Sequence, residues 1–76
     1  MELIDFVKNF ASQFEATAVS EFSPKTQFKN MAEWSSLMVL STIAIVDEEY
    51  DVEITGGDIQ NSTTIEDLYN IVKSKM

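Results

Sequence analysis

The chain contains no cysteine, no histidine and no arginine, and each absence excludes a class of function. Without cysteine there are no disulfides and no thiolate metal sites. Without histidine the chain lacks the usual general base and the commonest transition-metal ligand. A single domain of 76 residues buries only about 60% of its unfolded surface, which makes its stability marginal. Because neither disulfides nor thiolate metal sites can reinforce the fold, its stability must come from apolar burial alone.

Positive charge is also scarce, since five lysines face 13 acidic residues and the net charge is −8. This balance argues against binding nucleic acid or anionic membranes, which need clustered cations. It favours basic protein partners, although an acidic surface also confers solubility alone. No apolar run approaches the ~20 residues that cross a bilayer, and the N-terminus lacks the basic region of a secretory signal. We therefore expect a cytoplasmic monomer that does not insert into membranes.

Hydrophobic periodicity predicts an all-α fold, a small four-helix bundle with three main helices and one short one. The main helices are expected over residues 2–15, 36–50 and 64–75, and the short helix over 58–61. Ser35 is the expected N-cap of the second helix, while Thr63 and Glu66 fit a capping box before the last one. The glycines at 56 and 57 are expected in a turn, where positive φ is open to them.

The segment 16–35 is long for a loop in a compact domain and contains the only proline, Pro24. We expect its apolar side chains to fasten it across the helix ends. These are Val19, Phe22, Phe28, Met31 and Trp34. Most other aromatic residues are expected in the core: Phe6, Phe10, Phe14 and Tyr50; Trp34 is expected either in the core or shielding a ligand.

The helix expected over 36–50 has two distinct faces. Its inward arc consists of Val39, Ile43, Val46 and Tyr50, with Leu40 at the edge. Its outward side, unusually apolar for a surface, consists of Leu37, Met38, Ser41, Ala44, Ile45 and Glu48. Four acids gather at its C-terminal end, where the helix dipole disfavours negative charge: Asp47, Glu48, Glu49 and Asp51.

Enzyme chemistry finds little support in the sequence. A serine nucleophile would have no histidine base, and Lys25 and Lys29 lie in a polar loop that would not desolvate them. The pair Gly56-Gly57 is too short to cradle phosphate, and the acidic residues lack the spacing and central glycine of an EF-hand. We predict no catalytic residue and no metal site, which leaves binding or carrying.

The run Glu33-Trp34-Ser35-Ser36-Leu37 is followed, without insertion or deletion, by the acidic stretch 47–54 and by a Thr63-Thr64 helix start. Together with the size and the acidity, this arrangement resembles the acyl carrier protein family over nearly the whole chain. The resemblance implies 4′-phosphopantetheine, taken from coenzyme A, attached to Ser36 by a phosphopantetheinyl transferase. A serine at a helix N-terminus is suited to this role, because free amides and the dipole favour a phosphate there.

The resemblance also implies that the helix after Ser36 binds acyl-transferring or condensing enzymes through basic or apolar docking patches. The residues expected to contact partners are Ser35, Leu37, Met38, Ser41, Asp47 and Glu48. Ser35 stands where the family usually has aspartate, which makes it a rival attachment site. Met38 and Ser41 stand where acids are common, so docking should depend on apolar burial at Leu37 and Met38 more than on salt bridges.

We therefore expect a freestanding, non-catalytic acyl carrier protein, with fatty acid, lipid, polysaccharide-acylating and specialised pathways all open. One alternative is an aminoacyl or peptidyl carrier, which shares the fold and the serine, although the pronounced acidity favours an acyl carrier. The other is an unmodified interaction module of the same fold, binding protein through Met38, Ala44 and Ile45. The modification state separates the carriers from the module.

Overall fold

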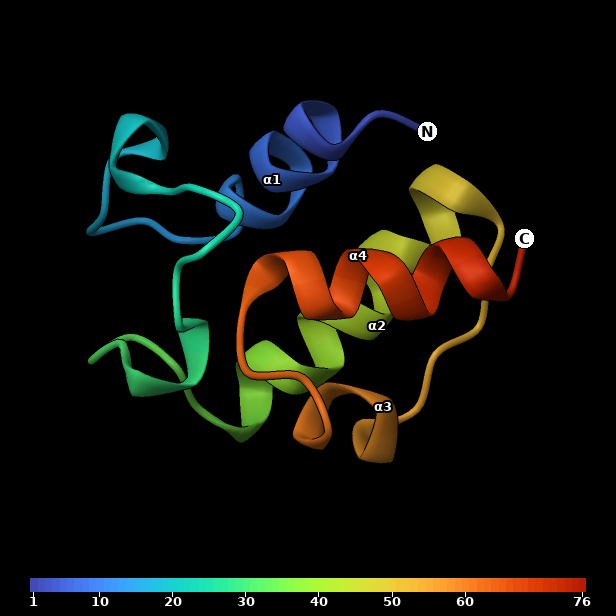
Figure 1. Ribbon diagram of the computed structural model, residues 1–76. Coiled ribbons are helices and arrows are strands. Elements are labelled where there is room, and N and C mark those ends of the chain that lie inside the picture. Colours follow the sequence, from blue (N-terminus) through green and yellow to red (C-terminus); the bar gives the residue numbers. More distant parts are fainter.

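The computed structural model describes all residues, 1–76, and is all-helical with no strands. Four α-helices follow one another: α1 (Leu3–Ala11), α2 (Ser36–Tyr50), α3 (Gly56–Gln60) and α4 (Ile65–Ser74). Two short 3₁₀ turns, η1 (Val19–Glu21) and η2 (Phe28–Asn30), lie in the connection between α1 and α2 (Figure 1). The prediction of a small bundle with three main helices and one short one is confirmed. No helix of the chain has the length and apolar character needed to cross a bilayer.

Helices α1 and α4 contact one another and supply most of the helical core. Each has a continuous buried stripe at helical spacing, as expected from its sequence. The stripes are Phe6, Val7, Phe10 and Ala11 on α1, and Ile65, Leu68, Tyr69 and Val72 on α4. Helix α2 contacts α1 and α3, and α3 also contacts α4.

Helix α1 ends at Ala11, four residues before the predicted end. At this end the Ser12 hydroxyl donates to the Asn9 carbonyl at 2.7 Å, a local bond of the kind that competes with helix continuation. The amide of Phe14 then bonds the carbonyl of Ala11 at 3.0 Å in a tighter turn. Phe14 is still buried, so the prediction that it lies in the core is confirmed, whereas the prediction that it lies within the helix is wrong.

The long connection is fastened by its apolar side chains, as predicted, with the exception of Val19. Phe22 and Phe28 are buried, and Met31 and Trp34 pack against the core. Val19 is 45% exposed and anchors nothing, because it lies in the outward-facing turn η1. Trp34 is half-buried and packs against the core, where its ring lies edge-on to Phe28 at a centroid distance of 4.8 Å.

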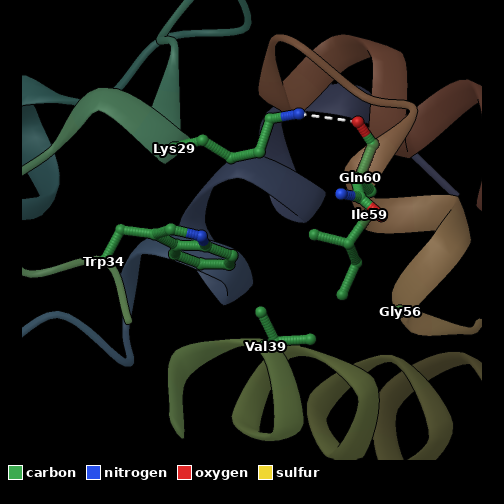
Figure 2. Close-up of a pocket in the computed structure, with 6 residues that line it drawn as sticks. All are labelled: Lys29, Trp34, Val39, Gly56, Ile59 and Gln60. Carbon is green, nitrogen blue, oxygen red and sulfur yellow. Dashed lines mark hydrogen bonds between the residues drawn. The ribbon is translucent and has the colours of Figure 1, made fainter. Parts of the chain in front are cut away.

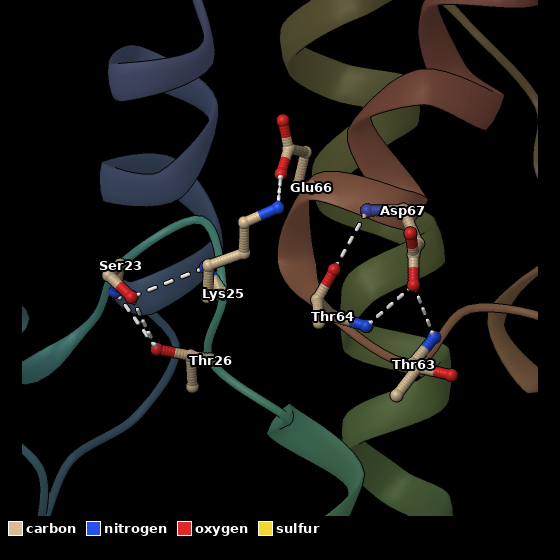
Figure 3. Close-up of polar contacts among 7 residues, drawn as sticks. All are labelled: Ser23, Lys25, Thr26, Thr63, Thr64, Glu66 and Asp67. Carbon is tan, nitrogen blue, oxygen red and sulfur yellow. Dashed lines mark hydrogen bonds and ion pairs between the residues drawn. The ribbon is translucent and has the colours of Figure 1, made fainter.

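The same connection docks onto the start of α4 (Figure 3). The carbonyls of Thr26 and Pro24 accept hydrogen bonds from the amides of Ile65 and Glu66, at 3.2 and 2.9 Å. Lys25 closes this contact with an ion pair to Glu66 at 2.6 Å. Two amides of the first turn of α4, which no helical carbonyl can reach, therefore have acceptors.

The capping box of α4 lies one residue later than predicted. Thr64 is the N-cap, and its side chain accepts from the amide of Asp67 at 3.2 Å. The Asp67 carboxylate accepts in return from the amides of Thr63 and Thr64, both at 3.0 Å. Glu66, the expected partner, instead pairs with Lys25.

Helix α3 begins two residues earlier than predicted, and its two glycines are helical with no positive φ. The cause is a second capping box, in which Thr55 accepts from the amide of Asp58 at 3.1 Å and Asp58 accepts from the amide of Thr55 at 3.0 Å. This box fixes the helix start despite the weak helix propensity of glycine.

Candidate functional site

The candidate site is the N-terminal turn of α2, which begins at Ser36 as predicted. Ser35 precedes it in an extended conformation, and its carbonyl accepts from the amides of Met38 and Val39 at 3.0 and 3.2 Å. Ser35 is thus the N-cap by position, but its side chain accepts no capping bond. The expected cap through the Ser35 hydroxyl is therefore wrong.

Ser36 is exposed, and its hydroxyl makes no hydrogen bond within the protein. The amides of Ser36 and Leu37 lie beside it and also have no acceptor in the protein. No acidic side chain occupies the first turn of α2. The helix thus begins with an accessible hydroxyl, two free amide donors and an uncompensated positive dipole end, an environment that favours an anion.

Two side chains hold the segment that leads into α2. On the inner side, the Trp34 ring stacks near Phe10 and Phe14, at centroid distances of 6.2 and 6.4 Å. On the outer side, the Glu33 carboxylate reaches back to the chain that follows α1. The site is therefore attached to the body by the two residues immediately before Ser35.

The Glu33 carboxylate makes three contacts with residues 15–17. Its Oε2 accepts from the amides of Glu15 and Ala16, both at 3.1 Å, and its Oε1 accepts from the hydroxyl of Thr17 at 2.9 Å. These bonds, that from Ala16 foremost, hold the pKa of Glu33 below its ordinary value of 4.5. Glu33 is therefore ionised at neutral pH.

The exposed face of α2 joins Ser36 to an apolar stretch and then to acids. Leu37 is 73% exposed and Leu40 is 65% exposed, and Ala44 continues the same face one turn further. Asp47 and Glu48 follow, both exposed and in no ion pair with a lysine. Of the six predicted partner residues, Leu37, Asp47 and Glu48 thus share one outward face with Ser36.

The remaining predicted contact residues are placed differently. Ser35 is exposed beside Ser36, whereas Met38 and Ser41 are only partly exposed. Met38 packs against the hydrophobic core, so the expectation that it points outward is wrong. Leu40, expected at the edge of the buried arc, is exposed instead.

The inward face of α2 is rotated relative to the prediction and has a polar residue at its centre. Thr42 is 1% exposed, and its hydroxyl donates to the Met38 carbonyl at 2.8 Å and accepts from the Gln13 amide nitrogen at 2.9 Å. The buried side-chain oxygen of Gln13, Oε1, makes no hydrogen bond. Val46 is the only apolar side chain of α2 that is fully buried, while Val39, Ile43 and Tyr50 are half-buried.

A pocket of about 350 Å³ lies beside the first turns of α2 (Figure 2). Trp34, Val39 and Ile59 form its apolar walls, and Gly56 completes the lining at α3. Lys29 reaches across it from η2 and donates to the Gln60 carbonyl at 2.7 Å. Because Val39 lies three residues after Ser36, the pocket wall begins within one helical turn of the candidate site.

Other site chemistry is sparse. No group of three acidic side chains lies close enough together to hold a metal ion. The acids at the end of α2 are followed by Asp51, whose left-handed conformation at φ 55° terminates the helix. The acidic end is thus a solvated, charged surface.

Three features of the site were not predicted from the sequence. These are the contacts of the Glu33 carboxylate with residues 15–17, here called the Glu33 clamp, the exposure of Leu40 and the burial of Thr42. Leu40 could have been found, because it lies one turn after both Ser36 and Leu37 on the same face. The other two had no sequence signal, since their partners are 16 to 29 residues away. Comparison of the chain with models of known families, with curated proteins and with solved structures found no match.

Proposed function

We propose that this chain is an acyl carrier that bears 4′-phosphopantetheine on Ser36 and presents it to partner enzymes along the exposed face of α2. The single observation that carries the proposal is the state of Ser36 itself. Its hydroxyl is exposed and unengaged, and two free amides lie beside it at a helix N-terminus. The acyl-carrier pattern of the sequence supplies the identity of the group.

The chemistry requires nothing from the chain except an accessible nucleophile. In the transfer, the Ser36 oxygen forms a bond to the phosphorus that carries pantetheine in coenzyme A. The pyrophosphate bond to the adenosine side breaks, 3′,5′-ADP leaves, and the hydroxyl proton passes to the transferase or to solvent. The product is an anionic phosphodiester, which the free amides and dipole of α2 favour.

The exposed face of α2 is the proposed surface for partners. Leu37 and Leu40 lie one helical turn apart directly after Ser36, and contiguous exposed apolar patches commonly mark protein contacts. Asp47 and Glu48 extend the same face with negative charge. A partner with an apolar socket beside a basic patch would match both parts, the charges speeding encounter and the leucines supplying affinity.

The pocket between α2 and α3 is the proposed shelter for the apolar part of the cargo. Its volume lies at the small end of the range of about 300–1,000 Å³ typical of ligand pockets. A Val39→Trp variant should fill the pocket and leave a tethered acyl chain exposed. Faster hydrolysis of the acyl thioester in this variant, with unchanged attachment at Ser36, is the expected result; equal hydrolysis rates would contradict the shelter.

The experiment that tests attachment is intact-mass measurement after incubation with coenzyme A, Mg²⁺ and a broad-specificity phosphopantetheinyl transferase. The wild-type protein and Ser35→Ala should each gain one phosphopantetheine group, and Ser36→Ala should gain none. A gain that is lost only in Ser35→Ala would move the site to Ser35. Ser35→Ala is a matched control because it removes the neighbouring hydroxyl, which makes no capping bond.

Two alternatives share the serine or the exposed face of α2. An aminoacyl or peptidyl carrier would use the same serine, and the loading of amino acids rather than acyl groups would distinguish it. An unmodified interaction module is favoured by the exposed Leu37 and Leu40, which could bind a partner without any attached group. Absence of a mass gain with several transferases, together with unimpaired partner binding, would favour the module.

A further inference from the structure

We propose that Glu33 is a positioning residue for the modification of Ser36: its carboxylate fastens the segment before α2 to residues 15–17 and thereby fixes where the serine hydroxyl is presented. This inference rests on the proposed function. It begins from an unusual contact, because an acidic side chain binds two successive backbone amides and a hydroxyl that lie 16 to 18 residues earlier.

The Glu33 clamp matters because α2 lacks the capping box that fixes the first turn of α3 and of α4. Helices α3 and α4 each begin with a capping box, in which a threonine and an aspartate lock the first turn. At α2 the N-cap side chain is unbonded and the first two amides are free. The side-chain contacts that hold the start of α2 therefore come from the segment before Ser35.

Three side chains in the stretch between η2 and α2 contact the rest of the molecule: Met31 and Trp34 pack against the core, and Glu33 binds residues 15–17. Trp34 fixes the inner side through the aromatic cluster, with Phe28 at a centroid distance of 4.8 Å. Glu33 fixes the outer side through charge-assisted bonds, which are about twice as strong as neutral ones. Leaving the first turn uncapped keeps its amides available for the phosphate, and the clamp supplies the rigidity that a cap would otherwise give.

A competing role for Glu33 would be direct recognition by the transferase, in place of the acid missing at Ser35. The contacts argue against that role. Both carboxylate oxygens are already engaged by Glu15, Ala16 and Thr17. A carboxylate satisfied by its own chain is suited to hold the segment in place and is poorly placed to pair with a cation of a partner.

The test compares kcat/KM for transfer of phosphopantetheine from coenzyme A to four variants and the wild-type protein. Glu33→Ala should lower kcat/KM about tenfold, because misplacement of a reacting group by about 1 Å costs up to about 100-fold. Glu33→Gln should recover most of the loss, since its carbonyl oxygen can still accept from Glu15 and Ala16. Thr17→Val, which removes only the Oε1 contact, should show a smaller loss in the same direction.

The fourth variant, Thr64→Ala, controls for stability, because it weakens the cap of α4 without touching Glu33 or Ser36. It should be modified as fast as the wild type at a temperature where both are folded. Hydrogen exchange of the Ala16 amide reports the clamp itself and should accelerate in Glu33→Ala and not in Thr64→Ala. If Glu33→Ala does not fold, the Thr17→Val comparison still decides.

The outcomes separate this inference from the proposed function. Wild-type protein that is never modified would refute the carrier proposal. Modified wild-type protein with equally fast Glu33→Ala and Thr17→Val would overturn the positioning role alone. Equal slowing of Glu33→Ala and Thr64→Ala would also overturn it, because the effect would then follow stability. Slowing of Glu33→Gln as severe as that of Glu33→Ala, with the Ala16 amide still exchanging as slowly as in the wild type, would indicate that the transferase reads the negative charge and would overturn the positioning role.

Discussion

Helices α2 and α4 have opposite relations to the rest of the molecule. Helix α4 buries a regular stripe, is locked by a capping box and has first-turn amides bonded by the preceding loop. Helix α2 is longer, yet it fully buries only Thr42 and Val46 and exposes two leucines. Its start is uncapped and its end is acidic, against the helix dipole. Helix α4 therefore contributes a full stripe to the core, whereas α2 leaves most of its side chains at least partly exposed.

The sharpest test of this contrast makes the same substitution in both helices. Leu68→Ala in α4 removes a side chain with 0% exposure and should lower the free energy of unfolding by about 2–5 kcal/mol. Leu40→Ala in α2 removes one that is 65% exposed and should change it by no more than about 0.5 kcal/mol. Urea unfolding followed by circular dichroism measures both. A loss at Leu40 comparable to that at Leu68 would show that α2 is packed as tightly as α4.

A second pair compares the helix starts. Thr64→Ala deletes a capping bond to the amide of Asp67 and should cost about 1 kcal/mol of unfolding free energy. Ser35→Ala deletes no capping bond, so its cost should be close to zero. Thermal or urea unfolding of the two variants distinguishes them. Equal losses would mean that the Ser35 side chain caps α2 in solution.

A third substitution should stabilise the start of α2. Ser35→Asp would place a negative charge beside two free amides and an uncompensated dipole, and should raise the free energy of unfolding by about 0.3–1 kcal/mol at neutral pH. The gain should shrink with added salt, because the carboxylate is exposed. The matched control is Ser74→Asp, which places the same charge at the C-terminal end of α4. It should lower the free energy of unfolding, because the helix dipole disfavours negative charge there. No gain at position 35 would contradict the picture of an unsatisfied helix start.

The smallest expected effect concerns pH. The amides of Thr64 and Thr63 hold the pKa of Asp67 below its ordinary value of 3.8. Because the folded pKa is lower than the unfolded one, this contribution is complete above about pH 4 and is lost as the pH falls through the folded value. Asp67→Asn should therefore flatten the acid side of the stability curve. An acid side as steep in Asp67→Asn as in the wild type would contradict the assignment.

Helices whose apolar pattern matches their burial could be predicted from the sequence. Helix ends, caps and the buried side of α2 could not, because they involve individual polar contacts. The stripe of α4 and the span Ser36–Tyr50 followed from periodicity and from the position of Ser36. The facing of α2 did not, because its apolar residues surround most of the helix and a buried Thr42 fixes the rotation. The early end of α1 coincides with a local bond of Ser12, and the shifted cap of α4 rests on three bonds among Thr63, Thr64 and Asp67, none of which composition reveals.

The candidate site divides in the same way. Exposure of Ser36, Leu37, Asp47 and Glu48 agrees with the outward face expected from the sequence. The inward packing of Met38 was missed because a methionine at this position is compatible with either face. The Glu33 clamp could not have been anticipated, since its partners belong to a segment predicted to be helical or unstructured.

The most direct test of the central claim, that α2 exists to present Ser36, is localisation of the attached group by fragmentation mass spectrometry. After incubation with coenzyme A and transferase, the tryptic peptide following Lys29 contains both Ser35 and Ser36. Fragment ions that place phosphopantetheine on Ser36 in the wild-type protein are the predicted result. A group on Ser35 or elsewhere, or no attached group under conditions that fully modify an established carrier, would contradict the account.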